Sequence, residues 1–355
     1  DALREAVAAS PARDLVGHAG GVHLLDAQAL SSLQRGILLA ASALTLDGRE
    51  GGLQAQLAVL RRAWIPRAHA WPKKARRYAA PDLPEESLIL DNGFGGFDAE
   101  AAYVIHPGKT SPAPWSNVLA NPRFGMILTE RGAGFTWASN SNLRRLTPFL
   151  NDPVRDRIGE TLYLRDEETG QFWTPTPAPC GSGAPIRVRH GQGYSLFETN
   201  GMGLTQRLTV FVDPEHTLSC RMLALENHGD STRRLSVTAF VQWAFHSAGE
   251  NRLLHQGENE GIVWVRHAAA QDIAYVTLPG HTVTYTTDAL AFLGNTGPER
   301  PRGMIEPALD QLGGEAPCAA LRCALTLAPG ERTTLCMLLG QARDPEEAAM
   351  HRRLY

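Results

Sequence analysis

Residue types that bind sugars are concentrated between Trp115 and Glu198. Proteins hold sugars by packing aromatic rings on C–H faces and by matching amide, carboxylate and guanidinium groups to pairs of hydroxyls. The candidates are Trp115, Asn117, Asn121, Trp137, Asn140, Asn142, Arg144, Arg145, Asn151, Asp152, Trp173, Arg189, His190, Gln192 and Tyr194. Most lie in segments with Pro, Gly or Asn, which predict loops, where binding residues gather. Each alone could instead cap a turn or hold a loop, but as a group they favour a carbohydrate surface.

The sequence gives weaker support to metal binding, phosphate binding and epimerase-like catalysis. The 12 histidines lack metal-ligand spacing, and the glycine-rich run at 93–96 is followed by no helical pattern that could present a helix N-terminus to phosphate. We therefore expect no metal and no cofactor. His190 and Glu198 resemble the acid and base of an aldose epimerase. On a straight strand, however, they would lie roughly 26 Å apart at about 3.3 Å per residue, so only a fold-back could bring them together.

The elements that would position these residues are mainly β-strands. Alternating or β-branched segments occur at 160–165, 204–212, 218–225, 235–245, 262–267, 273–278, 283–287, 321–327 and 333–339. The turn at 328–331 (APGE) predicts a hairpin between the last two segments. Many short strands without intervening helices favour a large antiparallel sandwich. A helix is expected to begin after Asp344, because Pro345 suits the first helical position and acids follow it.

The first 80 residues show helical spacing and a basic segment instead of strand patterns. Leucine and isoleucine recur at helical spacing between Leu24 and Leu39, and a second helical pattern runs from Leu53 to Leu60. From Arg61 to Arg77 there are seven basic residues and no acidic one, with two tryptophans and two prolines. This segment could meet a polyanion or a membrane surface, but the prolines favour a solvated connector to the next domain.

Composition excludes several classes of protein. The chain has 355 residues, 43% of them hydrophobic, and a formal charge of −3, which argues against a dedicated nucleic-acid binder. The longest apolar stretch, residues 36–46, is about half the length of a membrane span. Five cysteines without CxxC spacing predict free, buried thiols in a reducing compartment. On these grounds we expect a soluble, cytoplasmic chain.

Several segments carry a family resemblance. They are 92–97 (NGFGGF), 103–105 (YVI), 110–121 (TSPAPWSNVLAN), 134–152 (GFTWASNSNLRRLTPFLND), 163–177 (YLRDEETGQFWTPTP) and 189–197 (RHGQGYSLF). Together they resemble the phosphorylase-like region of cyclic β-1,2-glucan synthases, which is similar to glycoside hydrolase family 94. The PAPW segment is more specific to the glucan synthases, and the resemblance runs from about Leu53 to Tyr355.

The resemblance implies an architecture. Members of the family begin with a galactose-mutarotase-like β-supersandwich and continue through linker helices into an (α/α)6 barrel that holds the general acid. This implies N-terminal helices and connector at 1–80, the supersandwich at 81–342, and the start of a linker helix at 343–355. The barrel would be an adjoining partner domain, and we expect the sandwich itself to be inactive. A parent enzyme would be an inner-membrane protein with this domain on the cytoplasmic side.

The resemblance also implies site residues. The Arg-Arg-x-Thr segment gives Arg144, Arg145 and Thr147 as sugar-facing, with Arg145 as a bidentate clamp. The following segment adds Asn151 and Asp152, and Trp137 and Asn140 would be a platform and an amide contact. His190 and Gln192 could bind sugar or only hold their loop.

Three hypotheses follow. The first is a non-catalytic domain that holds β-1,2-linked glucan and shapes the active site of the adjoining barrel, with a homodimer possible and no nucleic acid bound. The second is a structural or dimerisation domain without sugar affinity. The third is a free-standing epimerase-like enzyme.

Overall fold

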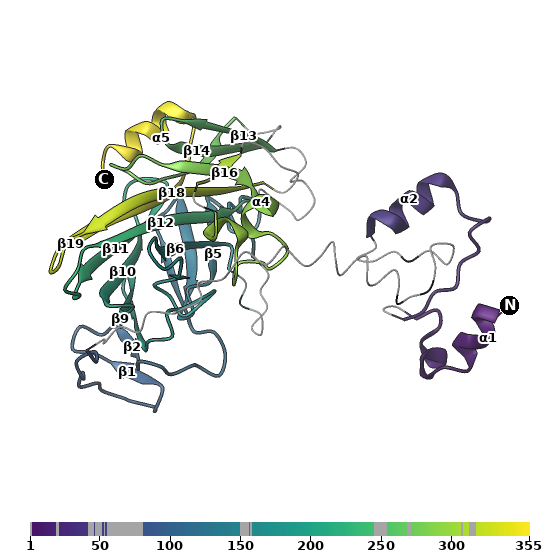
Figure 1. The fold of residues 1–355 in the computed structure, drawn as a ribbon, viewed down its shortest axis with the longest axis horizontal. Helices are drawn as coiled ribbons and strands as arrows, with labels where there is room; N and C mark the ends of the chain where they lie inside the picture. The colour runs from purple at the N-terminus through teal and green to yellow at the C-terminus, as the bar shows by residue number, and fades with distance from the viewer. Residues whose placement is uncertain are drawn as a thin grey trace. The chain divides into compact units, whose positions relative to one another are not determined.

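The computed structural model describes residues 2–18, 21–41, 46, 52, 54, 81–149, 156, 158–244, 254–267, 271–306, 308–311 and 317–355. The chain forms two compact units, residues 1–67 and 68–355. In the second unit the described residues form mainly antiparallel sheets, which confirms the expected mainly β, supersandwich class (Figure 1).

The largest sheet has ten antiparallel strands. Their order is β1 (Gly95–Phe97), β2 (Tyr103–Ile105), β8 (Ile186–Gly191), β9 (Tyr194–Gly201), β10 (Leu204–Val212), β11 (Leu218–Asn227), β19 (Arg332–Ala342), β15 (Ile273–Thr277), β14 (Ile262–His267) and β13 (Leu254–Asn259). β10 alternates buried and partly exposed side chains along its length, whereas every residue of β15 is buried, so part of the sheet is covered on both faces.

Two smaller sheets complete the sandwich. One has the order β17 (Asp310–Gln311), β16 (Thr284–Asp288), β18 (Pro317–Leu327), β12 (Arg233–Gln242), β6 (Glu160–Asp166) and β7 (Phe172–Trp173). The other consists of β3 (Ser116–Ala120), β4 (Phe124–Thr129) and β5 (Gly134–Ala138), and it packs on β8, β10 and β11. One hydrophobic cluster contains side chains from all three sheets. The described helices of this unit are α4 (Ala289–Leu293), the 3-10 turn η4 (Arg302–Met304) and α5 (Pro345–Arg352).

A buried polar cluster joins the three sheets. Glu160 on β6 accepts a hydrogen bond from Arg221 on β11 at 2.6 Å and another from the Thr136 hydroxyl on β5 at 2.9 Å. Glu160 and Arg221 are almost fully inaccessible to solvent. The cluster thus links one strand from each of the three sheets, and removing one member of the ion pair would leave an uncompensated buried charge.

The predicted strands agree closely with the observed ones, but the predicted hairpin is wrong. β18 pairs with β12 and β16 in the six-stranded sheet, whereas β19 pairs with β11 and β15 in the ten-stranded sheet. The turn at 328–331 therefore connects the two layers of the sandwich. Turn residues predict a reversal of the chain, but they do not determine which strand becomes the hydrogen-bonded neighbour.

The expectation of five free thiols is also wrong in part. Cys220 on β11 and Cys336 on β19 form a disulfide, while Cys180, Cys318 and Cys323 are free. The pairing follows from the register, because Cys220 lies opposite Leu338 and is diagonal to Cys336 on the neighbouring strand. The cytoplasmic location, which rested partly on free thiols, stays a prediction.

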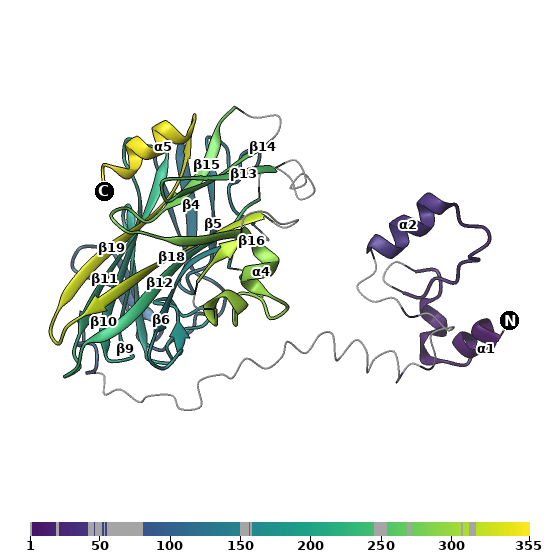
Figure 2. The same ribbon diagram turned by 45° about the horizontal axis from the view of Figure 1, so that its top comes forward.

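The expected C-terminal helix is confirmed as α5. The Asp344 side chain accepts from the Glu347 N–H at 2.9 Å, and Pro345 occupies the first turn, so the helix begins where the sequence predicts. The helix packs against β14, β15 and β19 (Figures 1 and 2). Among the described residues, no helix is long and apolar enough to cross a membrane.

The first unit contains α1 (Ala2–Ala8), the 3-10 turn η1 (Pro11–Leu15) and α2 (Ser32–Ala41). The helix expected from Leu24 begins only at Ser32, because Ser31 and Gln34 form a reciprocal capping box with distances of 2.9 and 3.2 Å. The second helical pattern at 53–60 and the basic connector at 61–77 lie almost wholly outside the described residues.

Candidate functional site

An open pocket of about 600 Å³ lies beside β2 and β8 of the ten-stranded sheet, in the size range of small-molecule sites. Its lining combines aromatic rings with polar groups, namely Asn92, Tyr103, Pro114, Trp115, Ser116 and His190. We call it the Trp115 pocket. Two of its residues, Trp115 and His190, belong to the set that the sequence singled out.

The sheet register places the pocket residues on one face. Tyr103 on β2 lies opposite His190 on β8, and His190 lies opposite Ser195 on β9. Cross-strand partners point to the same side of a sheet, so the three side chains form one row. Ile186 and Val188 precede His190 at two-residue steps and are buried, which identifies this side as the face turned to the core.

Two other rings, those of Phe94 and Phe97, pack against Tyr103 and Trp115. The centroids of Trp115 and Tyr103 are 5.6 Å apart at an interplanar angle of 80°, and Trp115 meets Phe94 at 5.8 Å and 75°. Phe97 contacts Tyr103 at 5.1 Å in the same edge-to-face manner. Edge-to-face pairs contribute about 0.5–1.5 kcal/mol beyond area burial, so they hold Trp115 in a defined orientation.

Two polar atoms of the pocket residues are unsatisfied. The His190 Nδ1 atom lies 2.9 Å from the Ser195 hydroxyl, but its Nε2 atom has no hydrogen bond among the described residues, and neither has the Tyr103 hydroxyl. Burial lowers the pKa of His190 to about 4, against a smaller opposing effect of the Trp115 backbone. The imidazole is therefore neutral at physiological pH, and its second nitrogen is buried without a hydrogen-bond partner among the described residues.

The segment that carries Trp115 is attached to the sheet by polar contacts. The Trp115 carbonyl accepts from the Glu130 N–H at 2.9 Å. Asn117 donates to the carbonyls of Gly191 and Tyr194, both at 2.9 Å, in the turn between β8 and β9. Asn121 caps the turn after β10 in the same way, through the carbonyls of Asp213 and His216. The amide groups of Asn117 and Asn121 therefore cap turns, as the alternative interpretation of these residues predicted.

The predicted residues of the Arg-Arg-x-Thr segment lie together in a second place, the loop after β5. The Arg145 guanidinium lies over the rings of Phe135 and Phe149, at 6.0 and 5.7 Å. It also donates to the Ser141 carbonyl and to Asn142 Oδ1, both at 3.1 Å. Arg145 is thus held in one orientation by its own loop, with part of its surface still exposed.

The predicted site residues near Arg145 differ in their contacts with the rest of the protein and in their exposure. Arg144 forms an ion pair with Asp272 at 2.8 Å, yet 48% of its side chain is exposed. Asn140 is exposed, and its Oδ1 accepts from the N–H groups of Asn142 and Leu143. Trp137 is half-buried and covers Gly125, where a Cβ atom would approach the indole ring to 2.5 Å.

Thr147 has no exposed surface, and its hydroxyl accepts from the Thr136 N–H at 2.8 Å. This position removes Thr147 from direct contact with a ligand in solution. Gln192 is exposed in the turn between β8 and β9. Asn151 and Asp152 lie outside the described residues.

The epimerase-like pair does not form. β8 and β9 fold back on each other, but Glu198 lies opposite Arg187, an odd number of residues from His190. The two side chains therefore point to opposite faces of the sheet. Glu198 instead lies near Arg207 at 3.2 Å and Arg187 at 4.0 Å.

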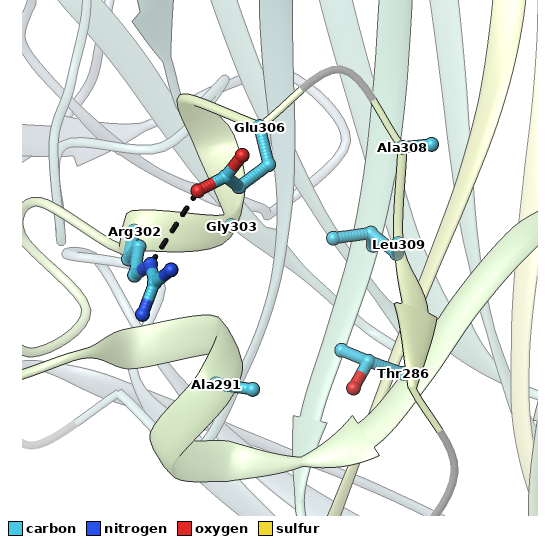
Figure 3. Close-up of a pocket in the computed structure, with 7 residues that line it drawn as sticks. All are labelled: Thr286, Ala291, Arg302, Gly303, Glu306, Ala308 and Leu309. Atoms are coloured by element: carbon cyan, nitrogen blue, oxygen red, sulfur yellow. Dashed lines mark hydrogen bonds and ion pairs between the residues drawn. The ribbon is translucent and has the colours of Figure 1, made fainter. Parts of the chain in front are cut away.

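A different pocket, of about 320 Å³, lies between α4, η4 and the β16–β17 region (Figure 3). Arg302 and Glu306 face each other across part of it at 3.4 Å, and the other lining residues include no aromatic ring. It therefore lacks the stacking surface of the Trp115 pocket. Among the described residues, no group of His, Cys, Asp or Glu has the arrangement of a metal site.

Asn92, Phe94 and Tyr103 were not predicted as site residues, although they lie in segments that carry the family resemblance. Phe97, Tyr103 and His190 belong to three different strands, and their common row depends on pairing that the sequence does not display. The only local signal was the density of aromatic residues at 94–103.

Comparison with known proteins identifies a family and several relatives of this chain. Residues 101–355 match the family model described as the supersandwich domain of glycosyl hydrolase 94. The cyclic beta-(1,2)-glucan synthase NdvB of Rhizobium meliloti is 29% identical over 301 residues, which are 78% of this chain and 10% of the synthase. N,N'-diacetylchitobiose phosphorylase of Vibrio furnissii is 28% identical over 274 residues, 72% of this chain and 34% of that enzyme.

The chain thus spans about a tenth of the first relative and about a third of the second. Among solved structures, a galactose mutarotase related enzyme from Lactobacillus acidophilus aligns with a TM-score of 0.39 and 10% identity. The alignment covers 64% of this chain and 97% of that enzyme.

Proposed function

The chain belongs to the glycosyl hydrolase 94 supersandwich family, and on this premise we propose that its β-unit is a non-catalytic domain that holds a β-glucan chain within a larger enzyme. The observation that carries the proposal is the Trp115 pocket, where aromatic rings stand beside unsatisfied polar atoms. Sugars need both features, because they present C–H faces and hydroxyls on the same ring.

The ligand that best fits this context is a β-1,2-linked gluco-oligosaccharide, given the similarity to a cyclic glucan synthase. We further propose that an adjoining (α/α)6 barrel follows α5 in the parent enzyme and carries the catalytic acid. The sandwich would then position the glucan and wall one side of the barrel's active site, and a homodimer is compatible with this role.

A structural role without sugar affinity is the second candidate, and the loop after β5 favours it. Arg145 already contacts two rings and two loop oxygens, and Arg144 already has an ion-pair partner. The groups that would clamp hydroxyls are thus used within the protein. The sugar-facing role of Trp137, Asn140, Arg144 and Arg145 remains a separate prediction that the same experiment tests.

The experiment is an isothermal titration of the protein with linear β-1,2-gluco-oligosaccharides, with cello-oligosaccharides for comparison. We expect selective binding that weakens at least about tenfold, or by about 1.4 kcal/mol, in Trp115→Ala, because the variant lacks the ring that packs on the C–H face of the sugar. Trp264→Ala is the matched control, because Trp264 is also half-buried but lies on β14, near the other edge of the same sheet.

Three outcomes separate the candidates. Lost affinity in Trp115→Ala with unchanged binding in Arg145→Ala supports the Trp115 pocket. The reverse result assigns the sugar to the loop after β5. No heat with either sugar, from protein whose circular dichroism is that of a folded β-protein, removes glucan binding and leaves the structural role.

A further inference from the structure

Trp115 stands at the end of a short segment that begins at Ser111 and includes Pro114, another pocket residue. This segment lies against the residue that follows β4, because the Glu130 N–H donates to the Trp115 carbonyl at 2.9 Å. The Glu130 side chain turns the same way and contacts the Ser111 hydroxyl through Oε1. Glu130 therefore touches the segment at both of its ends.

The Ser111 hydroxyl has two neighbours that accept hydrogen bonds. Its oxygen lies 2.6 Å from the Ala113 carbonyl oxygen and also within hydrogen-bond distance of Glu130 Oε1. A hydroxyl carries one proton, so it either shares that proton weakly between the two oxygens or makes a full hydrogen bond to only one of them. A second full hydrogen bond needs a proton from the other partner, and a backbone carbonyl has none. Only a protonated Glu130 carboxyl supplies it.

The surroundings of Glu130 favour the neutral acid. Its side chain is 3% exposed, and Oε2 has no hydrogen-bond partner among the described residues. Burial raises its pKa, and the nearby Asp156 raises it further, while hydrogen bonds from Ser111 and the backbone oppose the shift. Asp156 itself accepts from the Thr129 hydroxyl at 2.8 Å and lies near Arg131. No direct ion pair with Glu130 occurs among the described residues.

We propose that Glu130 is a positioning residue that works as a protonated acid, donating its proton to Ser111, which in turn donates to the Ala113 carbonyl. This relay fixes the segment from Ser111 to Trp115 and thereby the wall of the Trp115 pocket. The relay is an inference about the protein's own residues; only its consequence for sugar affinity rests on the proposed function.

Loss of the proton disrupts the relay. A carboxylate at Glu130 draws the Ser111 proton to itself, which leaves the Ala113 carbonyl without its donor and places an uncompensated charge in the interior. An acid whose pKa is raised in the folded state stabilises the fold at low pH and loses that contribution as pH rises from the unfolded value toward the folded one. The pocket wall should therefore loosen as the pH increases.

The first test reads the proton directly. Infrared difference spectra between the unsubstituted protein and Glu130→Gln, recorded over a range of pH, should show the C=O stretch of a protonated carboxyl that the variant lacks, at pH values where an ordinary Glu is ionised. The band should disappear as the pH is raised, and in Asp156→Asn it should disappear at a lower pH. Absence of the band at every pH where an ordinary Glu is ionised would overturn the relay.

The second test reads the pocket. The affinity for linear β-1,2-gluco-oligosaccharides should fall by about tenfold, equal to about 1.4 kcal/mol, as the pH rises through the pKa of Glu130. Glu130→Gln should show no such fall, because its amide donates to Ser111 without titrating. Ser111→Ala should bind weakly at every pH. Parallel pH profiles in the wild type and Glu130→Gln would refute the positioning role.

The two readouts separate the failures. If the carboxyl band is present but no glucan binds at any pH, the relay is supported and the proposed function fails. If glucan binds but the band is absent, the proposed function stands and the relay is overturned.

Discussion

Tyr103 differs from Tyr163 in what its hydroxyl contacts. The Tyr163 hydroxyl donates to the Pro298 carbonyl at 2.8 Å, whereas the buried Tyr103 hydroxyl has no partner among the described residues. An unsatisfied buried hydroxyl costs free energy in the folded state, and a ligand that satisfies it recovers that cost on binding. At this position the requirements of stability and of binding are therefore opposed.

Tyr103→Phe should leave the free energy of unfolding unchanged or raise it by up to about 1 kcal/mol, because it removes a polar atom that has no partner. Tyr163→Phe is the matched control and should lower that free energy by about 1–2 kcal/mol, because the Pro298 carbonyl loses its donor. Urea unfolding followed by circular dichroism measures both. Equal losses in the two variants would mean that the Tyr103 hydroxyl is satisfied in solution.

The buried pair of Glu160 and Arg221 gives a larger effect. Arg221→Met should lower the free energy of unfolding by about 3–5 kcal/mol, because among the described residues the Glu160 carboxylate then keeps only the Thr136 hydroxyl as a donor. The double variant Arg221→Met with Glu160→Gln should recover much of this loss, since it removes the uncompensated charge. A single-variant cost below about 1 kcal/mol in urea unfolding would show that solvent reaches the pair.

At the scale of the elements, α5 is attached to the sheet through titratable groups. His351 accepts or donates a hydrogen bond with the Tyr275 hydroxyl at 2.9 Å, and its ring lies 5.2 Å from that of His216. Tyr355 donates to Asp213 at 2.7 Å. Burial, followed by the nearby His216, lowers the pKa of His351, and that of Asp213 falls to about 2 because hydrogen bonds from Tyr355 and the backbone outweigh its burial.

Both shifts weaken the attachment of α5 in acid. A histidine with a lowered pKa contributes its full stability above the unfolded value of about 6.5 and loses it as the pH falls. A carboxyl with a lowered pKa likewise contributes its full stability above the unfolded pKa of about 3.9. Asp213 loses this contribution as the pH falls toward its folded pKa of about 2. The melting temperature should therefore fall between about pH 7.5 and about pH 5.5, and His351→Gln should reduce this fall. An identical pH dependence in both proteins would exclude His351 as the cause.

How far the elements could be predicted depends on which interactions define them. β10 and β14 have the predicted bounds, and α5 begins at its predicted cap, because alternation and capping are local patterns. The partner of β19 could not be predicted, since the turn at 328–331 reverses the chain equally well within a sheet or between two sheets. Tertiary packing of the apolar faces decides between them.

The candidate site was predictable in part for the same reason. Trp115 and His190 stand out by residue type, but their meeting requires that β2, β8 and the segment before β3 come together, which only the register shows. Arg145 was predicted from the Arg-Arg-x-Thr segment of the family resemblance. Its contacts with Phe135 and Phe149 depend on the conformation of the loop, which spacing does not reveal.

At the scale of the whole molecule, stability is distributed unevenly along the chain. Every buried hydrophobic residue that the structure describes lies between Ala102 and Ala348, and one core cluster draws on all three sheets. In the first unit no described side chain is buried, and Leu33 and Ile37 on α2 are mostly exposed. Burial of apolar surface is the main source of folding free energy, so among the described residues the second unit carries nearly all of it.

This distribution predicts how the protein tolerates truncation. Deleting residues 1–67 should leave the melting temperature of the sandwich unchanged within about 2 °C, and the unfolding transition should remain single, because the Glu160 cluster joins the three sheets into one cooperative unit. Differential scanning calorimetry of both proteins measures this. A second transition in the shortened protein would mean that the sheets unfold independently, and a fall of more than about 5 °C would mean that the first unit stabilises the sandwich.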